Sequence, residues 1–102
     1  MVDALVRVDF QFALGELRKG IRKLGVADNT VLWYCSDNGA IPKGSTGGLR
    51  ARKGSLYEGG IRVPAIIEWP AQIKSNRITN MNANTSDIYP TVLELAGSAL
   101  PK

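Results

Sequence analysis

The chain has 102 residues, of which 44% are hydrophobic and 22% are charged, as in an ordinary globular domain. No apolar run approaches the ~18 residues needed to span a bilayer, and the first residues lack the apolar core of a signal peptide, so we expect neither in this chain. Histidine is absent and cysteine occurs once, which rules out a Ser-His-Asp triad, a Cys-His pair and an intrachain disulfide built from this chain alone.

The net charge of +4 is concentrated in one segment. Residues 37–62 contain five basic residues against two acidic ones, a local charge of +3. The basic residues are Lys43, Arg50, Arg52, Lys53 and Arg62. A solvated surface is the default interpretation of such a segment, and an anion site is the alternative that its glycines favour. We expect no nucleic-acid partner, because no aromatic residues are interleaved with the basic residues of the helix predicted for residues 3–24.

Residues 3–24 are predicted to form a helix. Their apolar side chains recur at spacings of three and four, which places them on one face. The stripe consists of Val6, Phe10, Leu14, Leu17, Ile21 and Leu24. Gly25 stands where a left-handed C-cap would end the helix.

A strand is predicted for residues 30–35, Thr-Val-Leu-Trp-Tyr-Cys. Because the run is apolar on both faces, we expect a central, parallel strand that is covered on both sides. Residues 37–61 show no periodicity and contain seven glycines. A loop of this length in a compact domain is usually functional or disordered.

Residues 62–69 are predicted to form a second strand, with Pro64 at its start. A short helix follows, for which Ser86 is predicted as the N-cap and Gly97 as the closing residue. The order helix, strand, long loop, strand, helix indicates an α/β fold. Two strands are few for an independent domain, so we expect residues 1–102 to be one partial domain of a larger structure.

Asp37 and Asn38 follow directly after the first predicted strand. Ligands of open α/β sheets bind beyond the carboxyl ends of strands, and a carboxylate beside an amide carbonyl suits Ca²⁺ or Mg²⁺ rather than zinc. Two ligands fall short of the ~6 oxygens that calcium takes, and Asp-Asn-Gly alone is more often a turn. The glycine-rich segment that follows lacks the Walker pattern, because Ser45 stands where the lysine is required.

Three stretches of the chain together resemble a known family. They are "VADNTVLWYCSDNG", "GLRARKGSLYEGGIRVPAIIEWPAQI" and "NTSDIYPTVLELAG". In this order and spacing they are similar to the sulfatase family of the alkaline phosphatase superfamily, over nearly the whole chain. The resemblance implies a segment of an alkaline-phosphatase-like sandwich and the hydrolysis of sulfate esters of small molecules or glycans.

The resemblance also implies roles for three residues. Asp37 and Asn38 match ligands of the active-site divalent cation, which is usually calcium. Lys53 matches the lysine that contacts the sulfate group of the substrate. Arg50, Arg52 and Arg62 are interpreted as surface residues or as scaffolding of the loop.

The nucleophile of the family is a formylglycine made from the Cys or Ser of a C/S-x-P/A-x-R motif, which lies upstream of the matching region. Cys35 is not followed by that pattern and is interpreted as a buried strand residue. We therefore expect no catalytic residue in this chain, a formylglycine only in an upstream part, and no turnover by the chain alone. The compartment stays open, since family members are often periplasmic, secreted or lysosomal.

Two other interpretations remain. In the first, the chain is a segment of a related phosphodiesterase or phosphonate hydrolase. In the second, it is a stand-alone, non-catalytic module that binds anions or partners. An exposed strand edge, normally paired with missing strands, also predicts self-association.

Overall fold

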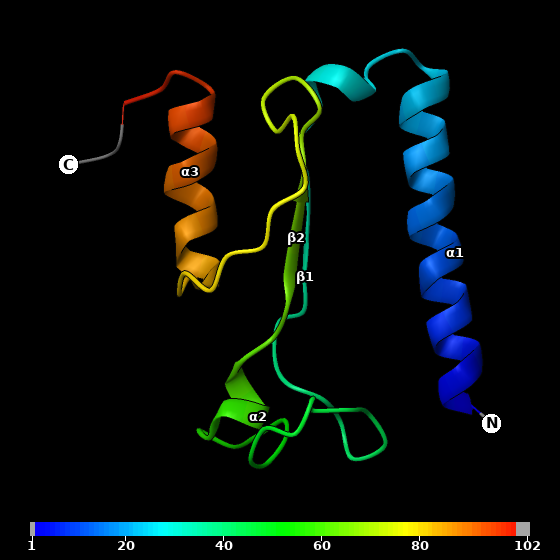
Figure 1. Ribbon diagram of the computed structural model, residues 1–102, viewed down its shortest axis with the longest axis vertical. Helices are drawn as coiled ribbons and strands as arrows, with labels where there is room; N and C mark the ends of the chain where they lie inside the picture. Colours follow the sequence, from blue (N-terminus) through cyan, green and yellow to red (C-terminus); the bar gives the residue numbers. More distant parts are fainter. Residues whose placement is uncertain (1, 100–102) are drawn as a thin grey trace.

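The computed structural model describes residues 2–99, with side chains from residue 12 onward. A two-stranded sheet lies at the centre, with α1 and α3 on opposite sides of it (Figure 1). The elements are α1 (Val2–Lys23), the 3₁₀ turn η1 (Ala27–Asn29), β1 (Leu32–Cys35), α2 (Glu58–Ile61), β2 (Ala65–Glu68), the 3₁₀ turn η2 (Thr85–Asp87) and α3 (Ile88–Leu95). The predicted order of helix, strand, loop, strand and helix is confirmed, with the short α2 added inside the loop.

Helix α1 begins and ends within one residue of the predicted range. Its C-terminus is closed by Gly25, whose φ of +72° is a conformation that glycine adopts without steric cost. The Gly25 N–H donates to the Arg22 carbonyl at 3.0 Å, and the Val26 N–H donates to the Ile21 carbonyl at 3.3 Å. This Schellman motif satisfies carbonyls that a helix end leaves free. No helix within the described residues is long and apolar enough to cross a membrane.

β1 and β2 pair in antiparallel orientation, with Leu32 opposite Glu68 and Cys35 opposite Ala65. The predicted parallel orientation is therefore wrong for this pair. The connection leaves and returns at the same end of the sheet, whereas parallel strands need a crossover to the opposite end. The expectation of a central strand covered on both sides is also wrong for the described residues, because β1 has β2 as its one neighbouring strand and its four residues are half-buried. An apolar run does not fix strand direction. Both strands are shorter than predicted, and Pro64 precedes β2.

The last helix is reached through a cap at Asn84, so the prediction of Ser86 as the cap is wrong. The Asn84 Oδ1 accepts a hydrogen bond from the Ser86 N–H at 2.8 Å, and the Asp87 Oδ2 accepts one from the Asn84 N–H at 2.7 Å. This capping box starts the helical turn at Thr85, one residue before the predicted cap. Gly97, with a φ of +70°, follows the end of α3 as predicted.

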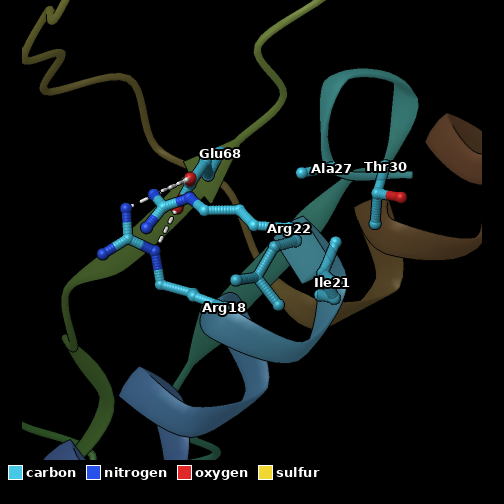
Figure 2. A pocket seen from close by; sticks show the side chains of 7 residues that line it. Arg18, Ile21, Arg22, Ala27, Thr30 and Glu68 are labelled. Carbon is cyan, nitrogen blue, oxygen red and sulfur yellow. Dashed lines mark hydrogen bonds and ion pairs between the residues drawn. The ribbon is translucent and has the colours of Figure 1, made fainter. Parts of the chain in front are cut away.

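Helix α1 is tied to β2 by charge. The Arg18 guanidinium donates two hydrogen bonds to the Glu68 carboxylate, at 2.7 Å from Nε and 3.1 Å from Nη2. Nη2 of Arg22 lies 3.5 Å from the same carboxylate, so both arginines point toward Glu68 (Figure 2). These hydrogen bonds are the main reason that the pKa of Glu68 is lowered and the pKa of Arg18 is raised.

Large apolar side chains stay open to solvent in much of the structure. Among the described residues no hydrophobic side chain is fully buried. Ile66 on β2 is 61% exposed, and Val92 on α3 is 50% exposed. The buried positions of the described chain are Gly39, Gly59 and Gly60. The tightest packing therefore lies in the loop that follows β1.

Candidate functional site

The turn at Asp37–Gly39 leaves the carboxyl end of β1 and contacts α2, at the lower end of the sheet in Figure 1. The Ser36 hydroxyl donates to the Asn38 carbonyl at 2.9 Å, and the Gly39 N–H donates to the Gly60 carbonyl at 2.8 Å. Asp37 is exposed and Asn38 is half-buried. Within the described residues neither side chain has a hydrogen-bond or ionic partner. Both side chains are therefore available as oxygen donors.

Three buried glycines bring the turn, α2 and the loop before α2 into backbone contact. A Cβ on Gly39 would lie closer than 3.0 Å to the Gly59 carbonyl. A Cβ on Gly59 would lie that close to the Ala51 carbonyl, and one on Gly60 to the Ser55 carbonyl. Real Cβ atoms essentially never approach so closely. Space therefore requires glycine at all three positions, which accounts for the Gly-Gly pair at the start of α2.

Lys53 is brought to the same end of β1 by its backbone. Its N–H donates to the Ala40 carbonyl at 3.0 Å, and Ala40 directly follows the Asp37–Gly39 turn. The Lys53 side chain is exposed, and its ammonium has no partner in the described part of the chain. An ammonium carried by backbone next to a turn with two oxygen donors can contribute to binding an anion together with a hard cation.

The three arginines of the same segment each contact a protein group. The contacts are Arg50 over the Tyr57 ring with its Cζ 3.6 Å from the centroid, Arg52 at the carbonyls of Ile41 and Gly44, and Arg62 at 3.5 Å from the Glu58 carboxylate. They agree with the interpretation of these residues as scaffolding. The two lysines of the segment, Lys43 and Lys53, have no hydrogen-bond or ionic partner among residues 12–99. No sequence pattern indicates the contact of Arg50 with Tyr57, because it depends on the path of the loop.

The donor set at the turn fits part of a hard-cation site. Carboxylate and amide oxygens are ligand types that Ca²⁺ and Mg²⁺ take, and Asp37 and Asn38 supply one of each. The described residues contain no group of three or more His, Cys, Asp or Glu side chains that could hold a metal ion. Since calcium takes about six to eight oxygens, these two residues can form only a fraction of such a site.

Cys35 is a free, half-buried residue of β1 that pairs with Ala65. It is therefore less buried than predicted, although it does lie within the strand. The small hydrophobic character of a cysteine suits this position on the sheet.

Two hollows lie against α1, and neither is lined by a residue of the turn or by Lys53. The first, beside Arg18 and Glu68, has a volume of about 10 Å³ and is as small as the space of one water molecule (Figure 2). The second is an open, apolar groove of about 290 Å³ between α1 and β1. Its lining residues are Ala13, Leu14, Leu17, Leu32, Trp33 and Tyr34.

Comparison with known proteins gives a consistent family. A family model described as Sulfatase matches residues 3–98. The chain is 46% identical over 80 residues to a protein named Sulfatase from Formosa agariphila, an alignment that covers 76% of the chain and 14% of that protein. It is 32% identical over 103 residues to the steryl-sulfatase of Mus musculus, covering 91% and 16%. It is 33% identical over 105 residues to the N-acetylgalactosamine-6-sulfatase of Canis lupus familiaris, covering 97% and 20%. The chain thus spans between 14% and 20% of the length of these relatives.

Proposed function

Since the chain belongs to the sulfatase family, we propose that it carries part of the divalent-metal and sulfate-binding site of a sulfuric ester hydrolase. The family membership confirms the resemblance on which the sequence-based assignment rested. The roles of individual residues go beyond it and are argued from the geometry of the turn and the loop.

In this proposal Asp37 and Asn38 are ligands of a divalent cation, with calcium as the expected ion. A bound cation acts as a Lewis acid that withdraws charge from the oxygens of a sulfate ester. Lys53 donates hydrogen bonds to a sulfate oxygen and offsets the negative charge that develops there. The observation that carries the proposal is the 3.0 Å hydrogen bond from the Lys53 N–H to the Ala40 carbonyl, because it joins the backbone of this lysine to the residue that follows the turn with both oxygen donors.

The chain supplies a part of the reacting centre in this account. The formylglycine nucleophile and the remaining cation ligands belong to sequence outside these residues, and residues 1–102 form one partial domain that shows no turnover alone. The span of 14% to 20% of the relatives' length supports this division. β1 and β2 are then two strands of an alkaline-phosphatase-like sandwich.

The proposed substrate class is a sulfate ester of a small molecule or of a glycan. The names steryl-sulfatase and N-acetylgalactosamine-6-sulfatase, which two of the relatives carry, support both kinds. We also propose that the chain self-associates when it is alone, because no strand of the described residues covers the outer edge of β2.

Terbium luminescence tests the cation half of the proposal, because Tb³⁺ can replace Ca²⁺ and is excited through nearby aromatic rings. The full chain is titrated with Tb³⁺, and the signal is competed with Ca²⁺. We expect a weak site, with a dissociation constant on the order of 1 mM, that is lost in Asp37→Ala and in Asn38→Ala. The matched control is Asp28→Ala, which removes a carboxylate from outside the turn and should keep the signal. An unchanged signal in Asp37→Ala would contradict the ligand assignment.

A sulfatase assay on the same chain tests the proposal that it holds only part of the active site. With an aryl sulfate as the substrate and Ca²⁺ present, we expect no release of sulfate above the rate of the buffer. Turnover that survives repeated purification and disappears in Lys53→Met would show that the chain holds a complete site, and the partial-site proposal would then be wrong.

A further inference from the structure

The loop that carries Lys53 is closed at its base by a contact between its two ends. Cζ of the Arg50 guanidinium lies 3.6 Å from the centroid of the Tyr57 ring, well within the ~6 Å of a cation–π contact. The Arg50 carbonyl also accepts a hydrogen bond from the Gly59 N–H at 2.7 Å. Arg50 is therefore attached to the residues after the loop through both its side chain and its backbone.

Between these ends the backbone adopts a conformation that needs support. Ala51 has a φ of +65°, in the left-handed region that residues with a Cβ rarely occupy. The Ser55 N–H donates to the Arg52 carbonyl at 3.0 Å, which closes the tight turn around Lys53. Such a backbone conformation persists only where surrounding contacts hold it in place. The residue directly before Ala51 is Arg50, whose contacts with Tyr57 and Gly59 can provide that support.

We propose that the stack of Arg50 on Tyr57 is the positioning element that keeps Lys53 at the carboxyl end of β1. The inference rests on the proposed function, which gives Lys53 its role toward the sulfate group. The Arg50 guanidinium lies over the ring, and a planar guanidinium can stack on an aromatic face in addition to making the cation–π contact. Arg50 acts through the backbone of the loop, whereas the Lys53 ammonium has no partner in the described residues and is the cation that meets the anion.

Amide hydrogen exchange measured by NMR on the full chain tests the proposal. Removing the stack in Arg50→Met or in Tyr57→Leu should speed exchange of the Lys53 and Gly59 amides about two- to fivefold, as expected for an exposed cation–π contact. Tyr57→Phe keeps the ring and should restore wild-type exchange at both amides. Lys43→Met removes a charge from the same loop without removing a contact, and it should leave both amides unchanged.

The exchange of the Ala96 amide, which donates to the Val92 carbonyl at 3.0 Å in the last turn of α3, serves as an internal reference. A local role predicts that this amide is unaffected in Arg50→Met. Equal acceleration at Ala96 and Lys53 would contradict the proposal, as would a Tyr57→Phe variant that behaves like Tyr57→Leu.

Titration with inorganic sulfate separates this inference from the proposed function. We expect Arg50→Met to weaken sulfate binding about two- to fivefold while Lys53 is intact. If Lys53→Met leaves sulfate binding unchanged, the proposed role of Lys53 is wrong, whereas faster exchange in Arg50→Met still supports the stack as the element that fixes the loop. If exchange of the Lys53 and Gly59 amides is unchanged in Arg50→Met, the stack is not the element that positions Lys53, whatever result the sulfate titration gives.

Discussion

The Lys53 N–H and the Ala40 carbonyl form a 3.0 Å hydrogen bond that joins the basic loop to the turn after β1. Around it, backbone touches backbone, because the buried residues at this end of the sheet are glycines. The candidate site is therefore held together by close backbone packing and not by a hydrophobic core, and its integrity depends on residues that carry no chemistry themselves.

Replacing Gly59 by alanine should damage this packing. The new Cβ would meet the carbonyls of Arg50 and Ala51 at impossibly short range, and these are backbone atoms that cannot rotate away. We expect a loss of about 1–3 kcal/mol in the free energy of unfolding, measured by urea denaturation. Gly15→Ala is the control, because nothing lies within 4 Å of its added Cβ in α1, and it should stabilise the chain by up to about 1 kcal/mol. Equal effects of the two substitutions would contradict the packing argument.

The capping box before α3 should matter for the stability of that helix. Asn84→Ala removes the acceptor of the Ser86 N–H and should cost about 1 kcal/mol of helix stability. Asn82→Ala, at an exposed neighbour without a partner in the described residues, should have little effect. The helical NMR shifts of residues 88–95 provide the measurement. A result in which both variants weaken α3 alike would argue against a specific cap.

The pair between α1 and β2 should make stability depend on pH. Hydrogen bonds from Arg18 hold the pKa of the Glu68 carboxyl below its ordinary value of 4.5, although burial opposes the shift. A carboxyl whose pKa is lower in the folded than in the unfolded chain stabilises the fold above the unfolded value, and the contribution is lost as the pH falls through the folded value. The free energy of unfolding should therefore fall below about pH 4.5, and it should fall less steeply in Glu68→Gln.

Urea denaturation at a series of pH values measures this slope. Glu16→Gln is the matched control, because Glu16 pairs with Lys19 on the same helix at 2.8 Å and joins no second element. A Glu68→Gln variant with the same acid slope as the wild-type chain would show that the pair does not link α1 to the sheet.

The open edge of β2 should make the isolated chain associate with itself. Ile66 is 61% exposed on this strand, and an unpaired, apolar edge is a template for pairing with another chain. Sedimentation velocity should therefore give a mass that rises with concentration, and Ile66→Lys should reduce the rise because charged edge residues oppose pairing. A wild-type chain that stays monomeric across the concentration range would contradict the proposed association.

Local patterns in the sequence predicted the local structure well. The apolar stripe and Gly25 located α1 and its Schellman cap, because both depend on neighbours within a few residues. Ser86 is not the cap, because Asn84 has a reciprocal hydrogen-bond partner at Asp87. The antiparallel pairing could not be predicted from an apolar run, since such a run is only typical of parallel sheets and β1 is half-buried in a two-stranded antiparallel pair.

Side-chain contacts that depend on the path of the chain could not be predicted from the sequence, for a physical reason. Arg18 meets Glu68, and Arg50 stacks on Tyr57, only because the chain path places them together, and no periodicity encodes that path. The positions of Asp37, Asn38 and Lys53 came from the resemblance to sulfatases. The structure adds the backbone hydrogen bond that brings the loop of Lys53 to the turn, while the roles of the three side chains stay predictions.

The most direct test of the central claim is an NMR titration of the full chain with sodium sulfate in the presence of Ca²⁺, comparing Lys53→Met with Lys43→Met. Both variants lose one positive charge from the same loop, and neither lysine has a partner in the described residues. A charge-assisted hydrogen bond to the anion predicts that Lys53→Met weakens sulfate binding about tenfold or more, while Lys43→Met changes it less than about twofold. Equal weakening in both variants would show that the loop attracts sulfate by its net charge alone, and would contradict the assignment of Lys53.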